Sequence, residues 1–422
     1  MWCALVICSL AAAEANPPTV DREVEVRRLV RLLDAPQLAE REAAEAKLIE
    51  MGPDVLGILP PPTSRAPAEV QQRLGRIRQQ LQRQRAIEAV QAATVTLRGK
   101  IALSEALATI QDQTGNTIAD RRPQFEGFGR NNPKVDVEFE AMPFWQALDD
   151  VLDQAGLGLY PYGENKTLNI VDRSEGQAAR GARVAYAGPF RIEPVRVEAD
   201  RDLRSGASAL RIALEVAWEP RLSPVSIALP MDSVKAVDDE GRSFEIGATQ
   251  VQLETAVLPD STATELNMPL PLPPRGVGSI ERLSGKIVTI VPGKLETFRF
   301  RDIEKASQVE QRIAGTTVML ERVRKNNELW QVFLRIRFDE AGDSLASHRN
   351  WIFDNPVYLE GPDGERLDPD AYETTRQTSN EVGVGYLFSV EKPLAQYTLV
   401  YQTAGMVLSN EFTFELTDIP LP

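Results

Sequence analysis

The spacing of apolar and polar residues changes along the chain, from a helical period near the start to a period of two in the second half. Between residues 21 and 92, apolar side chains recur every three or four positions, which is the spacing of one helix face. One stripe comprises Val26, Leu29, Val30 and Leu33, and another comprises Val70, Leu74, Ile77 and Leu81. Pro36 and the pair Gly52-Pro53 interrupt the pattern, as prolines do at helix ends. We therefore predict an α-helical region over residues 21–92.

Residues 94–171 contain an internal duplication. In each half, a strand leads into a helix that ends at a glycine, after which another strand begins. The two helices span equal distances, from Leu103 to Gly115 and from Phe144 to Gly156, and each places its apolar residues on one side. This order predicts a small sheet with two helices on one face.

From about residue 183 onward, apolar residues alternate with polar ones. The first clear strand places Leu210, Ile212, Leu214, Val216 and Trp218 on one face and Arg211, Glu215 and Glu219 on the other. We expect the first face to be buried and the second to be wet. A strand from Trp330 to Phe338 repeats this pattern, and similar strands at 296–303 and 411–419 close each unit. The pattern predicts two β-sandwiches, over residues 183–305 and 314–422.

Together these patterns predict a multidomain α+β protein with an N-terminal α-helical region, a duplicated βαβ module and two all-β sandwich domains. The sandwiches have a general immunoglobulin-like look. The cysteine and tryptophan signature of true immunoglobulin domains is absent from the sequence.

The composition limits the chemistry that the chain can perform. The chain has 422 residues, a net charge of -14, one histidine and two cysteines. The negative charge disfavours nucleic-acid binding, which needs clustered Lys and Arg. His348 alone cannot supply the ligands of a zinc site, and we interpret it as a loop residue rather than as part of a Ser-His-Asp triad. We therefore expect no cofactor, no metal site and no enzymatic activity.

One arginine-rich segment departs from the acidic average of the chain. It contains Arg65, Arg73, Arg76, Arg78, Arg83 and Arg85. Because the stripe from Val70 to Leu81 occupies one side of this predicted helix, we interpret the arginines as its solvated face. The alternative is a site for an anionic partner.

The first residues predict a secretory signal peptide over residues 1–15. An apolar run from Cys3 to Leu10 precedes small residues at positions 11, 13 and 15. The run is shorter than the roughly 18–20 apolar residues of a membrane-spanning helix, so we expect no transmembrane span. Cleavage after Ala13 or Ala15 would remove both cysteines and place the protein in the periplasm or the cell envelope.

The helical region resembles a HEAT-like helical hairpin. The resemblance is carried by the segment LLDAPQLAEREAAEAKLIEMG, in which REAAEAKL would be the packed helix and Gly52-Pro53 the turn. An ordinary amphipathic cap or a dimerisation element is the alternative.

The duplicated module resembles the short N-terminal (STN) domain of secretins and TonB-dependent receptors. The resemblance is carried by Leu103 with Ala106-Leu107, Gln113-Thr114-Gly115, Ala147-Leu148 with Leu152, Gly156-Leu157 and Leu168-Asn169-Ile170. It covers residues 94–171 and implies a non-catalytic interaction module that faces the envelope. Neither a secretin pore domain nor a receptor barrel follows in the sequence, so pore formation and siderophore uptake are not implied.

A candidate partner-binding loop lies between the two halves of the module, from Arg121 to Pro133. Its candidate residues are Arg121, Arg122, Phe125, Phe128 and Arg130. Aromatic rings interleaved with guanidinium groups suit protein recognition. The alternative is a simple linker between duplicated halves.

Several acidic groups are candidates for acid–base or calcium sites. Asp149, Asp150 and Asp153 are expected on the exposed face of an amphipathic helix, where an acid keeps an ordinary pKa and makes a poor general acid. The acidic turns at 238–240 and 363–370 allow calcium binding but lack the EF-hand spacing, so solvated turns are favoured.

These observations favour an exported, non-enzymatic interaction or scaffold protein of the cell envelope. It would bind a protein partner through the helical region and the STN-like module. The alternative function is a carbohydrate-binding or glycoside-hydrolysing protein that acts through its sandwiches, with aromatic rings to stack on sugars and an acid pair to hydrolyse them.

Overall fold

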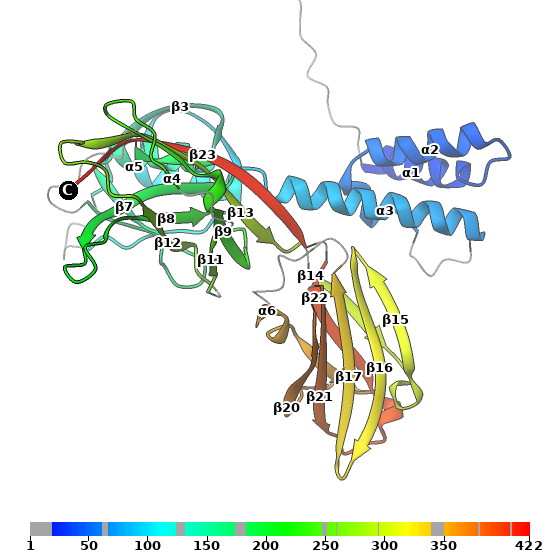
Figure 1. The fold of residues 1–422 in the computed structure, drawn as a ribbon. Coiled ribbons are helices and arrows are strands. Elements are labelled where there is room, and N and C mark those ends of the chain that lie inside the picture. The colour runs from blue at the N-terminus through cyan, green and yellow to red at the C-terminus, as the bar shows by residue number, and fades with distance from the viewer. Residues whose placement is uncertain are drawn as a thin grey trace, which may run out of the picture. The chain divides into compact units, whose positions relative to one another are not determined.

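The computed structural model describes residues 19–60, 66–123, 131–173, 183–246, 251–258, 260–293, 295–338, 350–378, 380–405 and 407–422. The chain forms two compact units, Met1–Arg85 and Ala86–Pro422, each of which is described by itself. A short helical N-terminal region is followed by strands in several sheets (Figure 1). The α+β class predicted from the sequence is confirmed at that level.

In its described residues, the first unit consists of three α-helices and one 3₁₀ turn. They are α1 (Thr19–Leu32), α2 (Leu38–Glu50), η1 (Pro53–Gly57) and α3 (Ala68–Ala89). Gly52 has a φ of 79°, a left-handed conformation that glycine adopts without strain, and Pro53 begins η1. The predicted stripes bury Val26, Leu29, Leu33, Val70, Leu74, Ile77 and Leu81 in one core, which also contains Ala44, Leu48, Val55 and Leu59.

Arg73 and Arg78 of α3 do not belong to a solvated face, so that prediction is wrong for these two, whereas Arg76 is exposed as predicted. Arg73 is 7% exposed and donates to Glu45 and Glu69, at 2.6 and 3.1 Å. Arg76 donates to both oxygens of Glu45, and Arg78 donates to main-chain carbonyls. These side chains tie α3 to its neighbours because a guanidinium can donate in several directions at once.

The second unit begins with the duplicated module. Its elements are β1 (Thr94–Ala102), α4 (Leu103–Thr114), β2 (Ile118–Asp120), β3 (Lys134–Pro143), α5 (Phe144–Gln154), β4 (Leu157–Tyr160) and β5 (Leu168–Asp172). Gly115 and Gly156 have φ angles of 69° and 68° next to the helix ends, as the sequence predicted. The strands form two small sheets rather than one: β1 pairs with β3, and β5 lies between β2 and β4.

The duplication extends to individual hydrogen bonds. Gln113 on α4 accepts from the backbone N–H of Thr96 at 2.8 Å and donates to its carbonyl at 2.9 Å. Gln154 on α5 makes the same two bonds with Asp136, at 2.8 and 3.0 Å. In both halves a glutamine two residues before the glycine cap therefore ties the helix to the strand that precedes it.

The first β-sandwich, sandwich 1, encloses one core between two sheets. One sheet has the order β12-β8-β7-β6 and the other has the order β10-β13-β9-β11, with β23 also paired to β13. The strands of the first sheet are β6 (Ala185–Ala187), β7 (Phe190–Arg201), β8 (Ser208–Trp218) and β12 (Ala263–Leu270). Those of the second are β9 (Ser226–Pro230), β10 (Lys235–Asp238), β11 (Gln252–Ala256), β13 (Ser279–Val291) and β23 (Leu408–Pro420), with η3 (Met231–Ser233) after β9. The predicted inward residues of β8, from Leu210 to Trp218, are buried in this core.

The second β-sandwich, sandwich 2, likewise encloses one core between two sheets. Its sheet orders are β14-β22-β18-β19 and β15-β16-β17-β21-β20. The strands are β14 (Leu295–Phe300), β15 (Ser307–Ile313), β16 (Thr316–Asn326), β17 (Leu329–Phe338), β18 (Val357–Glu360), β19 (Arg366–Leu367), β20 (Ala371–Gln377), β21 (Glu381–Ser389) and β22 (Thr398–Ala404). The described connections include the short helices η4 (Ile303–Lys305), α6 (Asn350–Phe353) and η6 (Leu394–Gln396).

The strand predicted to close each sandwich belongs to the other sandwich, so the boundaries predicted at 305 and 314 do not match the strand pairing. β14 pairs with β22, so Phe298 and Phe300 belong to the core of sandwich 2. The last strand, β23, pairs along β13, so Phe414, Leu416 and Ile419 belong to the core of sandwich 1 (Figure 1). Sandwich 2 is therefore an insertion between β13 and β23. The two strands have similar alternating sequences, and local pattern does not say with which sheet a strand pairs.

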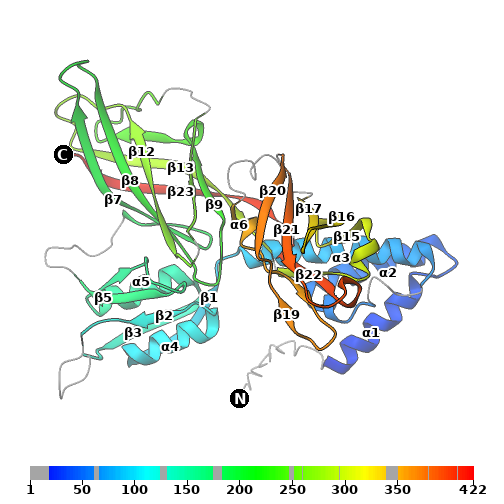
Figure 2. The ribbon, with the colours of Figure 1, turned by 90° about the horizontal axis from the view of Figure 1, so that it is seen from below.

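The duplicated module covers the outer face of the sheet β12-β8-β7-β6. Ala217 and Ala263, from that face, belong to the hydrophobic cluster of the module. Figure 2 shows the module next to the strands of sandwich 1. The face of β8 that was expected to be wet is therefore largely covered, and Glu219 on it is fully buried. A period-two pattern shows which face is apolar but not what packs on the other face.

Candidate functional site

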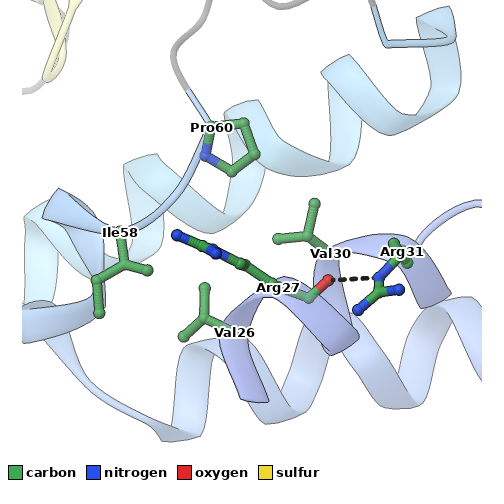
Figure 3. A pocket seen from close by; sticks show the side chains of 6 residues that line it. All are labelled: Val26, Arg27, Val30, Arg31, Ile58 and Pro60. Carbon is green, nitrogen blue, oxygen red and sulfur yellow. Dashed lines mark hydrogen bonds between the residues drawn. The ribbon is translucent and has the colours of Figure 1, made fainter. Parts of the chain in front are cut away.

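A hollow of about 370 Å³ lies on the helical unit and is the candidate partner-binding groove. Its lining consists of Val26, Arg27, Val30, Arg31, Ile58 and Pro60 (Figure 3). Val26 and Val30 lie one helical turn apart on α1, and Arg27 and Arg31 form a parallel row next to them. Because Val26 is fully buried in the helical core, the accessible apolar surface of the groove comes from Val30, Ile58 and Pro60, beside the two arginines.

Side chains from three elements hold the wall of this groove opposite α1. Val55 and Leu59 point into the core and leave Ile58 and Pro60 half-buried beside the hollow. Arg78 on α3 donates to the carbonyls of Leu59, at 3.1 Å, and of Pro60. Burial lowers the pKa of the Arg78 guanidinium, and these carbonyls satisfy its donors.

The two arginines of the groove are exposed, and each makes only weak contacts with the rest of the chain. Arg27 pairs with Glu23 at 2.5 Å, and both side chains are largely in solvent. Arg31 donates from Nε to the carbonyl of Arg27 at 3.3 Å, and has no salt bridge in the part of the chain that the structure describes (Figure 3). An exposed pair of this kind exchanges readily for a carboxylate of another molecule.

Of the five residues predicted as a partner-binding loop, the structure describes two, Arg121 and Arg122. Arg121 is exposed, and its backbone N–H donates to the carbonyl of Ile170 at 2.9 Å. Arg122 is 7% exposed and bonds both carboxylate oxygens of Asp120, at 2.9 and 2.7 Å. It also donates to the carbonyl of Asn131 at 2.9 Å, so it holds the two ends of the segment together. Phe125, Phe128 and Arg130 lie outside the described residues.

A buried ion pair joins the module to sandwich 1. Asp149 on α5 accepts from Arg191 Nε and from Tyr186 Oη, both at 2.8 Å. Arg191 also pairs with Glu193 at 2.7 Å. Burial disfavours the charged guanidinium, but the charges of Asp149 and Glu193 outweigh it and raise the pKa of Arg191. The prediction that Asp149 lies on an exposed face is wrong, because sandwich 1 packs against that side of α5.

A second buried cluster in the same interface centres on Glu219. Its carboxylate accepts from the backbone N–H of Ala93 at 2.9 Å, from Asn116 Nδ2 at 3.1 Å and from Arg221 Nε at 2.6 Å. Arg221 also donates from Nη1 to the carbonyl of Ala89 at 2.6 Å. The segment before β1, the module and sandwich 1 are thereby joined at one buried carboxylate.

Three glutamates form a row across the strands β7, β8 and β12. Glu193 lies directly opposite Glu215, and Glu215 lies directly opposite Glu265. Arg191 pairs with Glu193 and Arg196 pairs with Glu265, whereas Glu215 has no salt bridge within the described residues. Burial is the largest influence on Glu215 and raises its pKa. The neighbouring carboxylates of Glu193 and Glu265 also raise the pKa of Glu215. The charge of Arg191 and a hydrogen bond with Tyr162 lower this pKa, but the net shift is upward.

Two tyrosines of the module lie next to this carboxylate row. Tyr160 and Tyr162 are 49% and 39% exposed, and their ring centroids are 5.8 Å apart. Burial and the neighbouring charge of Glu215 raise the pKa of Tyr162. Half-exposed rings beside an acid with a raised pKa form the second candidate site.

The acidic turns that were weighed for calcium are satisfied by the protein itself. Asp238 accepts from the backbone N–H groups of Glu240 and Arg242, and Asp239 accepts from those of Gly278 and Ser279. Lys392 pairs with Asp363 and Glu365. Across the described ranges, no group of three or more His, Cys, Asp or Glu side chains is arranged to hold a metal ion. His348 lies outside those ranges.

Sequence reasoning did not single out the groove residues, although a signal for them exists. The dipeptide Val-Arg occurs at 26–27 and again at 30–31, one helical turn later. That repeat places an apolar row beside a cationic row, but the wall formed by Ile58 and Pro60 depends on a tertiary contact that no local pattern shows.

Comparison with protein-family models, with curated proteins and with solved structures finds no match for this chain. Within the part of the chain that the structure describes, no helix has the length and apolar character needed to cross a membrane.

Proposed function

We propose that the protein is an exported, non-enzymatic scaffold of the cell envelope that binds a protein partner through its helical unit and its duplicated module. The observation that carries this proposal is the groove on the helical unit, where the half-buried Val30, Ile58 and Pro60 supply apolar surface beside Arg27 and Arg31, and the fully buried Val26 completes the lining. Apolar surface bordered by arginine is typical of protein–protein contact sites.

The buried charges of the second unit support a structural role for the interface between the module and sandwich 1. Asp149 and Glu219 each bond an arginine and further donors, so both carboxylates bridge the module and sandwich 1. These buried bonds support the idea that sandwich 1 holds the module in a fixed position. The resemblance of the module to STN domains, and the immunoglobulin-like look of the sandwiches, remain part of the proposal. The repeated glutamine ties of the two halves support the duplication on which the first resemblance rests.

Site-specific photocrosslinking in the native cell envelope tests this proposal. A photoreactive residue replaces Val30 in the groove, Arg121 on the module, or Ala43 on the exposed side of α2 as a matched control. We expect adducts with one envelope protein from position 30 or 121 and none from position 43. Recovery of the full chain in the cytosol with Met1 intact would contradict export, and identical adduct patterns from all three positions would contradict a specific partner site.

A carbohydrate-active function is the second candidate, and one observation favours it. Directly opposed residues have Cβ atoms about 4.5–5.5 Å apart. The carboxyl groups of Glu193, Glu215 and Glu265 can therefore approach the spacing of about 5–5.5 Å seen in retaining glycosidases. Glu215 would be the general acid, and Tyr160 or Tyr162 would stack on a sugar ring. A glycan array together with hydrolysis assays of Glu215→Gln and Tyr160→Ala tests this function. Absence of any glycan binding or hydrolysis by the unmodified protein would remove it.

A further inference from the structure

We propose that the groove of the helical unit receives an acidic amphipathic helix of the partner protein, whose apolar residues enter the hollow and whose carboxylates bond Arg27 and Arg31. This inference rests on the function proposed above and names the chemistry of the partner.

The geometry of α1 specifies the spacing that the partner needs. Val26 and Val30 are four residues apart, and Arg27 and Arg31 are four residues apart, so each row advances by one turn, about 6 Å along the axis. Val26 is fully buried, so the accessible apolar surface beside the two arginines comes from Val30, Ile58 and Pro60. A partner helix with carboxylates at i+1 and i+5 matches the spacing of the arginines, and its apolar residues at i and i+4 lie next to those carboxylates, where they can meet this apolar surface. This is the helix-in-groove mode of recognition, in which side chains one turn apart act as anchors.

The size of the hollow favours a few side chains over a whole small-molecule ligand. At about 370 Å³ it lies at the lower end of the range of about 300–1,000 Å³ found for small-molecule pockets. Figure 3 shows Arg27 reaching towards Ile58 and Pro60, and Arg31 beyond Val30. A carboxylate that bonds Arg27 therefore lies next to the apolar side chains of Ile58 and Pro60, whereas one that bonds Arg31 lies beyond Val30.

The charges around the groove favour a carboxylate partner over a neutral or basic one. Arg31 has no salt bridge within the described ranges, and the partner of Arg27 is the exposed Glu23 on its own helix. The adjacent Arg28, in contrast, donates from Nε and Nη2 to both oxygens of Glu25, at 2.8 and 2.7 Å. Arg31 is thus open to an incoming acid, and Arg27 can exchange its single carboxylate contact for one, whereas Arg28, with two hydrogen bonds to Glu25, is a built-in control on the same helix.

Binding of synthetic helical peptides to the full-length mature protein tests the inference. One peptide carries leucines at i and i+4 with glutamates at i+1 and i+5, a second carries glutamines in place of the glutamates, and a third carries lysines there. Fluorescence anisotropy measures the affinity of each. We expect the glutamate peptide to bind at least about tenfold more tightly than the glutamine peptide, with an affinity that falls as salt is added.

Charge reversal provides the decisive comparison. In Arg27→Glu/Arg31→Glu we expect the glutamate peptide to bind no more tightly than the glutamine peptide, and the lysine peptide to bind more tightly than both. Arg28→Glu should have the same order of affinities as the unmodified protein. Unchanged thermal melting of each variant shows that the fold is retained, because all three side chains are exposed. Equal affinities for the glutamate and glutamine peptides, or an equal effect of Arg28→Glu, would overturn the inference.

The outcome is separable from that of the crosslinking experiment. Adducts from position 30 that persist in Arg27→Glu/Arg31→Glu would leave the proposed function standing and overturn the acidic-helix inference. Adducts that disappear in this variant and persist in Arg28→Glu would support both.

Discussion

Replacing Arg191 with methionine should destabilise the second unit by about 3–5 kcal/mol. The side chains of Arg191 and Asp149 are only 3% and 4% exposed, and their contact is 2.8 Å long. Methionine keeps the apolar bulk of the stem but leaves the Asp149 carboxylate buried beside sandwich 1 without its cation. Removing one partner of a buried pair typically costs this amount, because a buried charge loses both water and its counter-charge.

Arg196 is the matched control for this prediction. It lies five residues further along β7 and also bonds two carboxylates, those of Glu198 at 2.9 Å and Glu265 at 3.0 Å, but its side chain is 53% exposed. Arg196→Met should therefore cost only about 0–1 kcal/mol. The contrast between the two variants isolates burial, since the residue type, the substitution and the strand are the same.

Urea unfolding followed by tryptophan fluorescence measures both effects, since Trp145 and Trp218 are buried in the module and in sandwich 1. The double variant Asp149→Leu/Arg191→Met should recover most of the loss, because it removes both charges of the pair. Equal losses for Arg191→Met and Arg196→Met would refute the reasoning. So would a double variant that is no more stable than Arg191→Met.

Three further changes test other parts of the structure. Glu215→Gln should stabilise the protein by about 1 kcal/mol at pH 7. Because folding raises the pKa of Glu215, ionisation of this carboxyl group destabilises the unmodified protein as the pH rises through its raised pKa. The stability gained by Glu215→Gln, measured in thermal melts of the variant and the unmodified protein, should therefore shrink as the pH falls towards 4.5. A stability gain that grows in acid would contradict this argument. Deleting residues 408–422 removes β23, so it should unfold sandwich 1 and leave sandwich 2 folded. Limited proteolysis measures this, and unfolding of sandwich 2 alone would contradict the pairing of β23 with β13. Gly163→Ala should destabilise the protein by roughly 1–3 kcal/mol, because the added Cβ would lie 2.0 Å from the carbonyl oxygen of Thr167. Gly75→Ala on α3 should stabilise the protein by about 0.5–1 kcal/mol, because its added Cβ meets nothing within 4 Å. Equal melting shifts of one sign for the two glycine variants would contradict the steric argument.

Local pattern was enough to predict features that depend on neighbours in the sequence. The helical stripes, the glycine caps at 115 and 156 and the inward face of β8 all follow from periodicity and from the conformational freedom of glycine. In each case the physical cause lies within a few residues, so the sequence carries it directly.

The features that the sequence did not predict depend on a partner far along the chain. Asp149 and Glu219 belong to surfaces that look polar and exposed in isolation, and they are buried because a second layer packs on them. Arg73 looks like a surface cation until α2 places Glu45 beside it. The exchange of β14 and β23 has the same origin, since alternation defines the two faces of a strand but not its neighbour.

The insertion of sandwich 2 between β13 and β23 determines the order in which the sandwiches can be completed during synthesis. Sandwich 1 starts first, yet it lacks its closing strand until the ribosome has added residues 408–420, after every strand of sandwich 2 has been made. Throughout that interval one long edge of β13 has no partner, and an open edge is a template for pairing with other chains. The growing chain is therefore most vulnerable to aggregation just before its last strand emerges, and a chaperone that covers β13 would act in that interval.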